Sequence, residues 1–570
     1  MTISTVETYR VDDIPLLLAI MAELGIQQEI DREIKPHGLW QGCSVGTIVV
    51  IWLCYILTEQ DHRLEPVQSW VNSRQRLFNQ LLGIELRETD FTDDRLANVL
   101  TMLSVEGKQE LIAQRLSQDW ITMYELPTEV SRYDSTTIAV YQAADEGEES
   151  IIGYGQSKDH RPDLAQFKVM LSSLDMGLPL TSQVLNGKRA DDGLYVPTYD
   201  QVVQTVGHSR FLAVGDSKMA AWETRCHLAV KGSWYLCPYR EPASRGDDTE
   251  QWIEEALKNP EQWQAVTRTD KKTGEVKTMA QVYHWSRPQK WKGPDGEEVT
   301  WDERVLVTHS PALQQGLLTR RERKEAKLYQ ALQKLQLPPS RGRKRYRSEL
   351  ELRQVVDQML KQFGMTGLVT VTLTAETHKD GGQRWIVADY QRHQVAWEAM
   401  VARLGWQIYL TNAPEQLYTV AQIIHTYRRQ PLLERSISRL KSRNLHIRPV
   451  FLQDQQRIAA LTWLLVLALR ILVLTEFRVR QELKLRHQSI IGLKPGSPTT
   501  AIDRPTTERI LKAFDGLTWS IISFHDQTQH FHLTPLTQTQ LHILDLLHLS
   551  ADIYLNLNFD HPKPLFNLRE

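Results

Sequence analysis

Two aspartates within apolar, strand-forming segments constrain this chain more than any other feature. Asp134 lies inside the β-rich segment 131–141, and Asp216 directly follows the short apolar segment 211–215. A lone carboxylate in or beside a buried strand is costly to remove from water. Each aspartate therefore needs a local hydrogen-bonding partner, or the two share a cation. If only one such aspartate were present, a local hydrogen-bonding partner would be the favoured interpretation. Because two are expected on neighbouring strands of a mixed sheet, a shared metal ion is an equal alternative.

Strand and helix patterns around these aspartates predict a mixed α/β sheet. The expected strands, in chain order, are 131–141, 166–174, 178–185, 211–215 and 405–411. The second and third are joined by the short link 175–177, and we expect the first three to form an antiparallel meander. Helical patterns over 196–206 and 219–229 flank the fourth strand.

A third acidic residue, Glu434, follows the fifth expected strand on a helical segment. Its apolar neighbours recur at helical spacing at Leu432, Leu433, Ile437 and Leu440. Lys441 comes seven residues, or two turns, after Glu434, so both should point the same way. The flanking cations allow two interpretations. The segment is a solvated charged face with i,i+4 ion pairs, or Glu434 is a metal ligand whose neighbours hold a polyanion.

The three acids follow the pattern of a ribonuclease-H-like core. One aspartate lies on the first strand, one follows the fourth strand, and a glutamate lies on the helix after the fifth. Three local motifs make the resemblance specific: 133–137 (YDSTT), 214–217 (VGDS), and Tyr427 with Glu434 and Lys441 at intervals of seven. The segment 153–164 also resembles one that follows the first aspartate in such proteins. The chain resembles bacterial insertion-sequence DDE transposases of the YREK group, over roughly residues 130–475.

This resemblance implies the site and its chemistry. Asp134, Asp216 and Glu434 would be the catalytic residues and would hold magnesium, for which manganese can substitute. Carboxylates are suitable hard ligands for both ions. DNA contacts would come from Tyr427, Lys441, Arg428 and Arg429, with His160 and Arg161 as further candidates; for His160 a structural role in a loop is an equal alternative. The partners would be double-stranded DNA, as terminal inverted repeats and target, and a second copy of the chain in a homodimer.

Two residues depart from the YREK pattern. Gln430 stands where the pattern has arginine, and Arg428 or Arg429 would have to substitute. Pro431 stands where an aromatic residue is usual. Because proline is favoured in the first turn of a helix, we expect the Glu434 helix to start afresh at Pro431.

The expected domains follow from changes in pattern. Residues 1–128 are expected to form a helical N-terminal domain for DNA-end binding or oligomerisation. The two halves of the core lie at 129–232 and 405–480, and a β-rich insertion separates them at 233–404. A C-terminal region follows at 481–570. Within the insertion, residues 320–347 carry 11 Lys or Arg against two Glu. We expect a basic loop there to contact phosphates through Arg341, Arg343, Lys344 and Arg345; the alternative is a solvated linker.

Composition limits the remaining possibilities. With 41% apolar and 24% charged residues and a net charge of −2, the chain is of the soluble globular class. Its four cysteines match no zinc pattern and are expected to be buried, reduced thiols. The apolar segment 459–474 is short for a bilayer and contains Arg470, so we expect a buried helix. A cytoplasmic protein without a membrane segment is the expectation.

Three functions are compatible with these residues. The first is a transposase that hydrolyses phosphodiesters at element ends and joins the freed 3′ hydroxyl to target DNA. The second is a domesticated DNA-binding protein that keeps the fold without catalysis, against which the presence of all three acids argues. The third is a metal-dependent nuclease that cleaves without joining.

Overall fold

The computed structural model describes residues 3–144, 147, 150–159, 161–240, 248–270, 273–293, 296–337, 344–377 and 382–559. The chain forms two compact units. The first consists of Met1–Cys237 with His425–Glu570, and the second of Pro238–Ile424. The second unit therefore begins and ends later than the insertion expected at 233–404.

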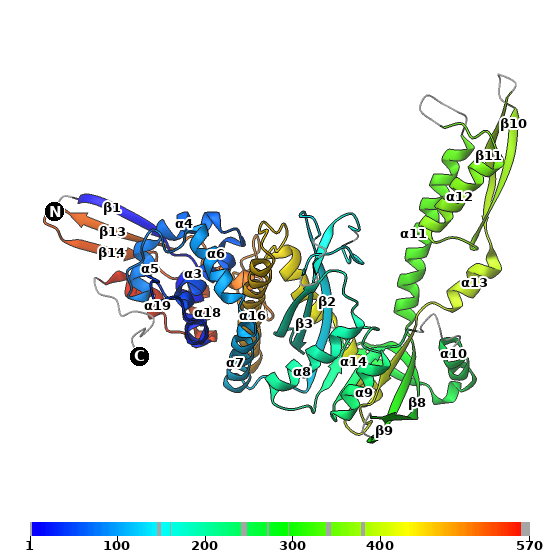
Figure 1. The fold of residues 1–570 in the computed structure, drawn as a ribbon, viewed down its shortest axis with the longest axis horizontal. Coiled ribbons are helices and arrows are strands. Elements are labelled where there is room, and N and C mark those ends of the chain that lie inside the picture. Colours follow the sequence, from blue (N-terminus) through cyan, green and yellow to red (C-terminus); the bar gives the residue numbers. More distant parts are fainter. Residues whose placement is uncertain are drawn as a thin grey trace. The chain divides into compact units, whose positions relative to one another are not determined.

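Helices dominate the N-terminal region of the first unit (Figure 1). They are α1 (Ile14–Glu23), α2 (Ile26–Glu33), α3 (Val45–Glu59), α4 (Glu65–Asn72), α5 (Gln75–Leu82), α6 (Asp93–Leu103) and α7 (Lys108–Met123). Side chains cap two of the helices, since Ser44 Oγ accepts from Thr47 N and Thr92 Oγ1 accepts from Arg95 N. Such caps satisfy backbone donors that a helix start leaves free.

A strand precedes these helices, so the expectation of an all-helical N-terminus was wrong. β1 (Ile3–Arg10) pairs antiparallel with β13 (Thr518–Phe524), which also pairs with β14 (Gln529–Leu533). Figure 1 shows these strands from the two ends of the sequence side by side. The C-terminal region also contains α17 (Thr507–Lys512), α18 (Gln538–Leu546) and α19 (Asp552–Leu555). Because β1 pairs with residues some 500 positions away, its local sequence gives no sign of its partner.

The apolar segment expected to be a buried helix lies within α16 (Gln455–Leu485), which is 31 residues long. This helix is long and apolar enough to cross a membrane by length and composition alone, and 94% of its most apolar window is buried inside the protein. It packs against α3, α6, α17 and α18. It therefore serves as a central packing element of the first unit. The four cysteines are buried free thiols, as expected.

Arg470 is buried within α16 and has no carboxylate partner in the part of the chain that the structure describes. Its Nη2 donates to Ser117 Oγ (2.7 Å), and its guanidinium lies 4.3 Å from the ring centre of Trp120. Burial lowers the pKa of Arg470 to about 9. The charge is thus desolvated without an opposite charge to compensate it.

We expect Arg470→Met to raise the free energy of unfolding by about 1–2 kcal/mol, because methionine keeps the packing and removes the buried charge. Ser117 Oγ would stay satisfied, since it also donates to the carbonyl of Ala113 (2.6 Å). Chemical denaturation would measure the change. Lys484→Met, on an exposed position of the same helix, is the control and should change stability by less than about 0.5 kcal/mol. A destabilised Arg470→Met variant would contradict this expectation.

The first unit carries five strands of a larger mixed sheet, in the order β4-β3-β2-β5-β6. Its strands are β2 (Val130–Val140), β3 (Ala165–Leu174), β4 (Pro179–Asn186), β5 (Leu212–Val214) and β6 (Trp234–Pro238). The meander β2-β3-β4 is antiparallel, as predicted, whereas β5 pairs parallel with both β2 and β6. Helices α8 (Tyr195–Val206) and α9 (Trp222–Val230) flank β5 in sequence. The strand expected at 405–411 is present as β12 (Trp406–Thr411), but the strand that follows β5 and pairs with it is β6, which was not expected.

The second unit is more helical than the β-rich insertion expected. Four strands of the large mixed sheet belong to this unit and pair antiparallel in the order β12-β9-β8-β7. They are β7 (Gln264–Thr269), β8 (Val276–Lys292), β9 (Glu298–His309) and β12 (Trp406–Thr411). Its helices are α10 (Asp248–Lys258), α11 (Pro311–Gln336), α12 (Glu349–Phe363), α13 (Gln394–Ala402) and α14 (Val420–Tyr427). A hairpin of β10 (Val369–Thr377) and β11 (Gln383–Arg392) completes it.

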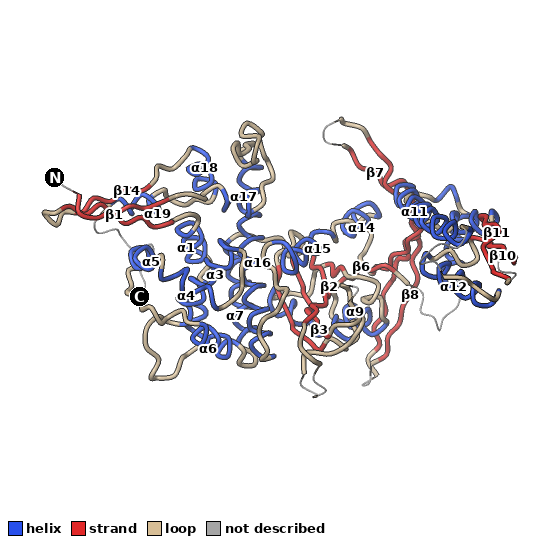
Figure 2. The backbone as a smooth tube through the Cα atoms, turned by 90° about the horizontal axis from the view of Figure 1, so that it is seen from above, coloured by secondary structure: helices blue, strands red, loops and turns tan. Residues whose placement is uncertain are grey.

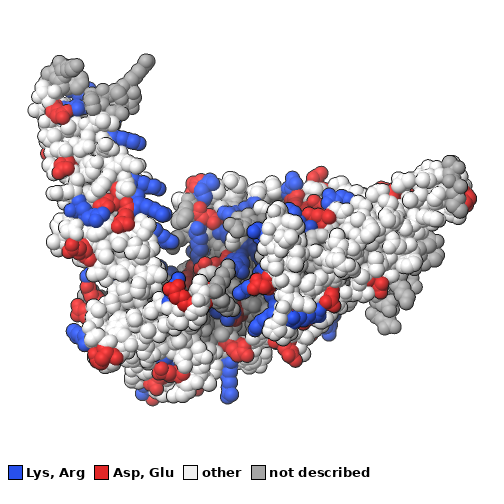
Figure 3. Space-filling view, turned by 180° about the vertical axis from the view of Figure 1, so that it is seen from behind, with Lys and Arg blue, Asp and Glu red and all other residues white. Residues whose placement is uncertain are grey.

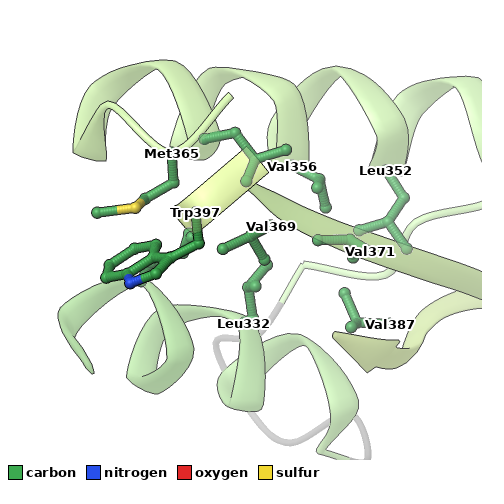
Figure 4. Close-up of a cluster of buried hydrophobic side chains, with 10 residues drawn as sticks. Leu332, Leu352, Val356, Met365, Val369, Val371, Val387 and Trp397 are labelled. Carbon is green, nitrogen blue, oxygen red and sulfur yellow. The ribbon is translucent and has the colours of Figure 1, made fainter. Parts of the chain in front are cut away.

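Part of this unit has a hydrophobic core of its own. Leu328 and Leu332 of α11 pack with Val356 of α12, Val371 of β10 and Trp397 of α13 (Figure 4). All five side chains are buried. We call the segment built on this core, residues 311–402, the helix–hairpin module.

Candidate active site

The register of two parallel strands brings Asp134 and Asp216 to the same end of the sheet. Arg132 of β2 lies opposite Val214 of β5. Asp134 and Asp216 each come two residues further along their segments. The register therefore holds the two carboxylates at the same level. They are close to each other because neighbouring strands lie about 4.8 Å apart.

Asp134 is largely buried, with 22% of its side chain exposed. Its Oδ1 accepts from the backbone N–H of Ser135 (2.8 Å) and lies 3.6 Å from Nζ of Lys158. Burial raises the pKa of Asp134 to about 6, opposed by the charge of Lys158 and reinforced by the charges of Asp216 and Glu434. Both other predicted acids therefore act electrostatically on Asp134.

Asp216 is held by the segment that follows β4. Its Oδ1 accepts from the hydroxyl of Tyr195 (2.6 Å) and from the backbone N–H of Lys218 (2.8 Å). Burial, and then the charge of Asp216, raises the pKa of the Tyr195 hydroxyl, so it remains a donor. Gly215 permits the close approach of Tyr195, because a Cβ there would lie 3.0 Å from Cε1 of Tyr195. These contacts fix one carboxylate oxygen of Asp216.

Glu434 lies on α15 (Pro431–Ser438), which packs beside β2 (Figure 2). The helix begins with Pro431, as predicted, after a turn that separates it from α14. The side chain of Glu434 is exposed, and no described residue forms a hydrogen bond or ion pair with it. It is therefore an available carboxylate that contributes to the field at Asp134.

The three carboxylates have the donor chemistry that magnesium and manganese require, since both prefer oxygen ligands. Among the described residues, no three carboxylate, histidine or cysteine side chains are close enough to form one closed ligand set. Magnesium is commonly held by one or two carboxylates with phosphate oxygens and waters completing its shell. An open arrangement of this kind fits a metal that binds together with a phosphate substrate.

A buried arginine connects β2 to the start of α15. Arg132 Nε and Nη2 donate to Oδ1 of Asp175 (2.9 and 2.6 Å), in the turn between β3 and β4. Its Nη2 also donates to the carbonyl of Thr426 (2.7 Å), and its Nη1 to Oε1 of Gln430 (3.3 Å). Arg132 thereby links the strand that carries Asp134 to the residues immediately before the Glu434 helix.

This contact explains the departure at Gln430. The side chain is buried and accepts a hydrogen bond from Arg132. An arginine at position 430, as the YREK pattern has, would bring a second guanidinium against Arg132. Gln430 is thus suited to an internal role at this position.

Two further contacts hold α15. Ser436 Oγ donates to the carbonyl of Gly177 (2.8 Å), in the same β3–β4 turn as Asp175. At the other end of the helix, buried Arg439 pairs with Glu476 and with Glu508 (3.0 Å). Arg439 is therefore engaged within the protein, and the orientation of Glu434 is supported from both ends of its helix.

Lys158 was not identified as a site residue from the sequence, although it lies in the segment that resembles transposases. Its Nζ donates to the carbonyl and to Oγ of Ser135 (2.5 and 2.9 Å) and approaches Asp134 and Asp191. The segment 153–164 around Lys158 was the feature that could have pointed to this residue. No rule of residue spacing predicts a contact between residues 24 positions apart. Lys158 supplies the cation that compensates Asp134 here.

Lys441 also lies at this site but does not continue the Glu434 helix regularly. It belongs to a π-helical turn, Arg439–Arg443, which changes the angular spacing assumed for two α-helical turns. Its Nζ donates to Oδ1 of Asp159 (2.6 Å) and to Oγ1 of Thr136 (3.0 Å). Arg448 pairs with the same Asp159 (2.9 Å). A phosphate could engage Lys441 only after competing with Asp159.

The remaining predicted DNA contacts are dispersed. Arg429 pairs with Asp175 (2.5 Å), and Arg161 pairs with Asp163 (2.7 Å). Tyr427 ends α14 and Arg428 follows it, both half-buried. Lys344, which pairs with Glu351, and Arg345, which donates to the carbonyl of Gln383, belong to the second unit. His160, Arg341 and Arg343 lie outside the described residues.

Comparisons with known proteins give two similarities. A family model described as a domain of unknown function (DUF4277) matches residues 6–116. No curated protein matches the chain. Among solved structures, the chain is similar to the piggyBac transposase in a synaptic complex with hairpin DNA, at 11% identity and a TM-score of 0.24. That match covers 52% of this chain and 63% of the piggyBac chain, so the chain spans less than two thirds of it. A likeness of this extent gives no residue correspondence, and the roles of the carboxylates depend on their own geometry.

Proposed function

We propose that this protein is a DNA transposase, which cleaves phosphodiester bonds at the ends of a mobile element and joins the freed 3′ hydroxyl to target DNA. One observation carries the proposal. Asp134 and Asp216 stand at the same level on adjacent parallel strands, and Glu434 contributes to the same electrostatic site. Its partners would be the two DNA ends and the target, bound by a homodimer.

The residues would divide the work by position. Asp134, Asp216 and Glu434 would hold magnesium, and both other acids act electrostatically on Asp134. When bound, the ions would activate the attacking hydroxyl or water and stabilise the leaving oxygen. The Tyr195 hydroxyl orients Asp216, and Arg132 with Gln430 orients the helix that carries Glu434. Lys158 would neutralise Asp134 until metal and phosphate replace it.

Cleavage of duplex DNA from the immediate genomic flanks of this gene tests the proposal. With magnesium or manganese, the wild-type protein should cleave at a defined position. Glu434→Gln should reduce the rate more than about 1000-fold, since a lost ligand removes roughly 4 kcal/mol of transition-state stabilisation. Glu223→Gln replaces an exposed carboxylate on α9 of the same unit and should leave the rate unchanged.

The products separate the alternatives. Strand-transfer products from a pre-cleaved end would support a transposase, whereas cleavage without joining would indicate a nuclease of the same fold. Specific binding without cleavage under either metal would overturn the proposal in favour of a non-catalytic DNA-binding protein.

A further inference from the structure

A row of unpaired cations follows one face of α11 in the helix–hairpin module. The row, which we call the basic stripe, consists of Arg320, Arg323, Lys324, Lys327 and Lys334. All five side chains are exposed, and none forms an ion pair or hydrogen bond with any residue in the described part of the chain. Blue side chains line one edge of this segment in Figure 3.

Helical geometry places the stripe on a face of its own. At 3.6 residues per turn, its members fall within an arc of about 100°. The buried residues of the helix, Glu325, Leu328 and Leu332, centre about 130° away and face the module's core. Glu325 pairs with Arg392 there, and Glu322 falls outside the arc. The stripe is therefore free of acidic side chains from its own helix.

Several other exposed cations in this unit are compensated, and others that form no ion pair with a described residue, such as Lys258, Arg268, Lys292 and Lys361, lie on four separate elements. Lys277 pairs with Glu275 (3.1 Å), Lys290 with Glu298 (2.8 Å), Arg353 with Glu349 (3.5 Å) and Arg403 with Glu250. A solvated charged helix commonly shows such pairs at i,i+3 or i,i+4. The stripe lacks them, so its charges remain available to an external polyanion.

We propose that the basic stripe binds the phosphate backbone of double-stranded DNA. Arg320 and Lys334 are 14 residue steps apart, or about 21 Å along the helix, which equals about six phosphate spacings along one strand of the duplex. A helix held by its own hydrophobic core keeps these charges in a fixed line, as a regular duplex backbone requires. Contacts of this kind set affinity and position and do not read base sequence. The inference deepens the proposed function by naming a surface that holds the DNA.

The salt dependence of binding tests the inference. Each neutralised phosphate contributes about −0.9 to the slope of log K against log salt for duplex DNA. The stripe variant, Arg320→Gln, Arg323→Gln, Lys324→Gln and Lys327→Gln together, should make the slope less negative by about 3.6. The control variant, Lys277→Gln, Lys290→Gln, Arg353→Gln and Arg403→Gln together, removes two Lys and two Arg that are paired. Fluorescence anisotropy of the full chain on a 30-base-pair duplex of arbitrary sequence, between 50 and 200 mM KCl, would measure both.

A slope change confined to the stripe variant, with unaltered thermal unfolding, would support the inference. Equal changes in the two variants, or no change in either, would overturn it, because general charge would then account for binding. A larger loss on single-stranded DNA or RNA than on the duplex would also overturn it. Metal-dependent cleavage by the wild type is a separate readout. If the wild type does not cleave but the salt slope changes in the stripe variant, the proposed transposase activity is contradicted and the basic stripe is supported. If the wild type cleaves but the salt slope does not change, the basic stripe alone is contradicted.

Discussion

Replacement of Asp134 by asparagine is expected to abolish metal-dependent cleavage and, in the same molecule, to stabilise the metal-free fold. Burial raises the pKa of Asp134 to about 6, with Asp216 and Glu434 adding repulsion. The ionised carboxylate is thus disfavoured in the folded protein at neutral pH. Its removal should raise the free energy of unfolding by about 1–2 kcal/mol, after allowance for solvent screening and for the lost attraction of Lys158. Such a gain on loss of a functional residue is typical of strained active sites.

The pH dependence of this gain in unfolding free energy follows from the raised pKa of Asp134. The folded protein holds the Asp134 proton more tightly than the unfolded chain, whose aspartates titrate near 4. The protonated side chain therefore favours the fold fully below about pH 4, and this contribution is lost as pH rises through about 6. The asparagine variant lacks this titration. Its advantage over the wild type should be largest at pH 7 and above and should shrink towards pH 4.

Thermal and chemical unfolding of metal-free protein across this pH range would measure the effect, and the cleavage assay would measure the loss of activity. Asp192→Asn is the matched control. Its exposed carboxylate pairs with Lys218 (3.4 Å), so removal should change stability by less than about 0.5 kcal/mol at any pH. Added magnesium should stabilise the wild type and have little effect on Asp134→Asn. An asparagine variant that is less stable at pH 8, or that still cleaves, would refute the role given to Asp134.

Several features of this fold could be predicted because their signals are local. Strand-forming segments close together in the sequence identified the meander β2-β3-β4, and the short apolar run before Asp216 identified β5. Proline at position 431 located the start of α15. The cost of desolvating a carboxylate directed attention to Asp134 and Asp216, which the structure holds at the same level of the sheet.

Other features depend on pairings between distant parts of the chain. β6 is only five residues long and β12 six, so local sequence could not decide which of them pairs with β5. β1 was missed because its partner β13 lies near the other end of the sequence. Lys158 and Arg132 likewise act through contacts across 24 and about 300 residues. No periodicity reports such contacts.

The second large effect is expected at Arg132. Its side chain is fully buried and donates to Asp175, Thr426 and Gln430. Arg132→Met would leave the Thr426 carbonyl and the Gln430 amide without their donor and would weaken the compensation of Asp175. Loss of one partner from a buried ion pair costs about 3–5 kcal/mol, and because Arg429 still pairs with Asp175 we expect about 2–4 kcal/mol here. Arg429→Met is the matched control. It contacts the same carboxylate from an exposed position and should cost less than about 1 kcal/mol.

A functional readout distinguishes positioning from general destabilisation. Arg132 connects the Asp134 strand to the start of the Glu434 helix, so its loss should separate two proposed metal ligands. Residues that orient ligands typically contribute 10–100-fold to metal affinity. We therefore expect Arg132→Met, at a temperature where it remains folded, to require about 10–100-fold more manganese for half-maximal cleavage. Gln430→Ala should shift the same midpoint by a smaller factor, since it removes only the single 3.3 Å contact. Arg429→Met should not shift it. If Arg132→Met is less stable but keeps the wild-type manganese midpoint, Arg132 stabilises the fold and does not position the metal ligands. The contacts of Ser436 and Arg439 would then be the ones that position α15.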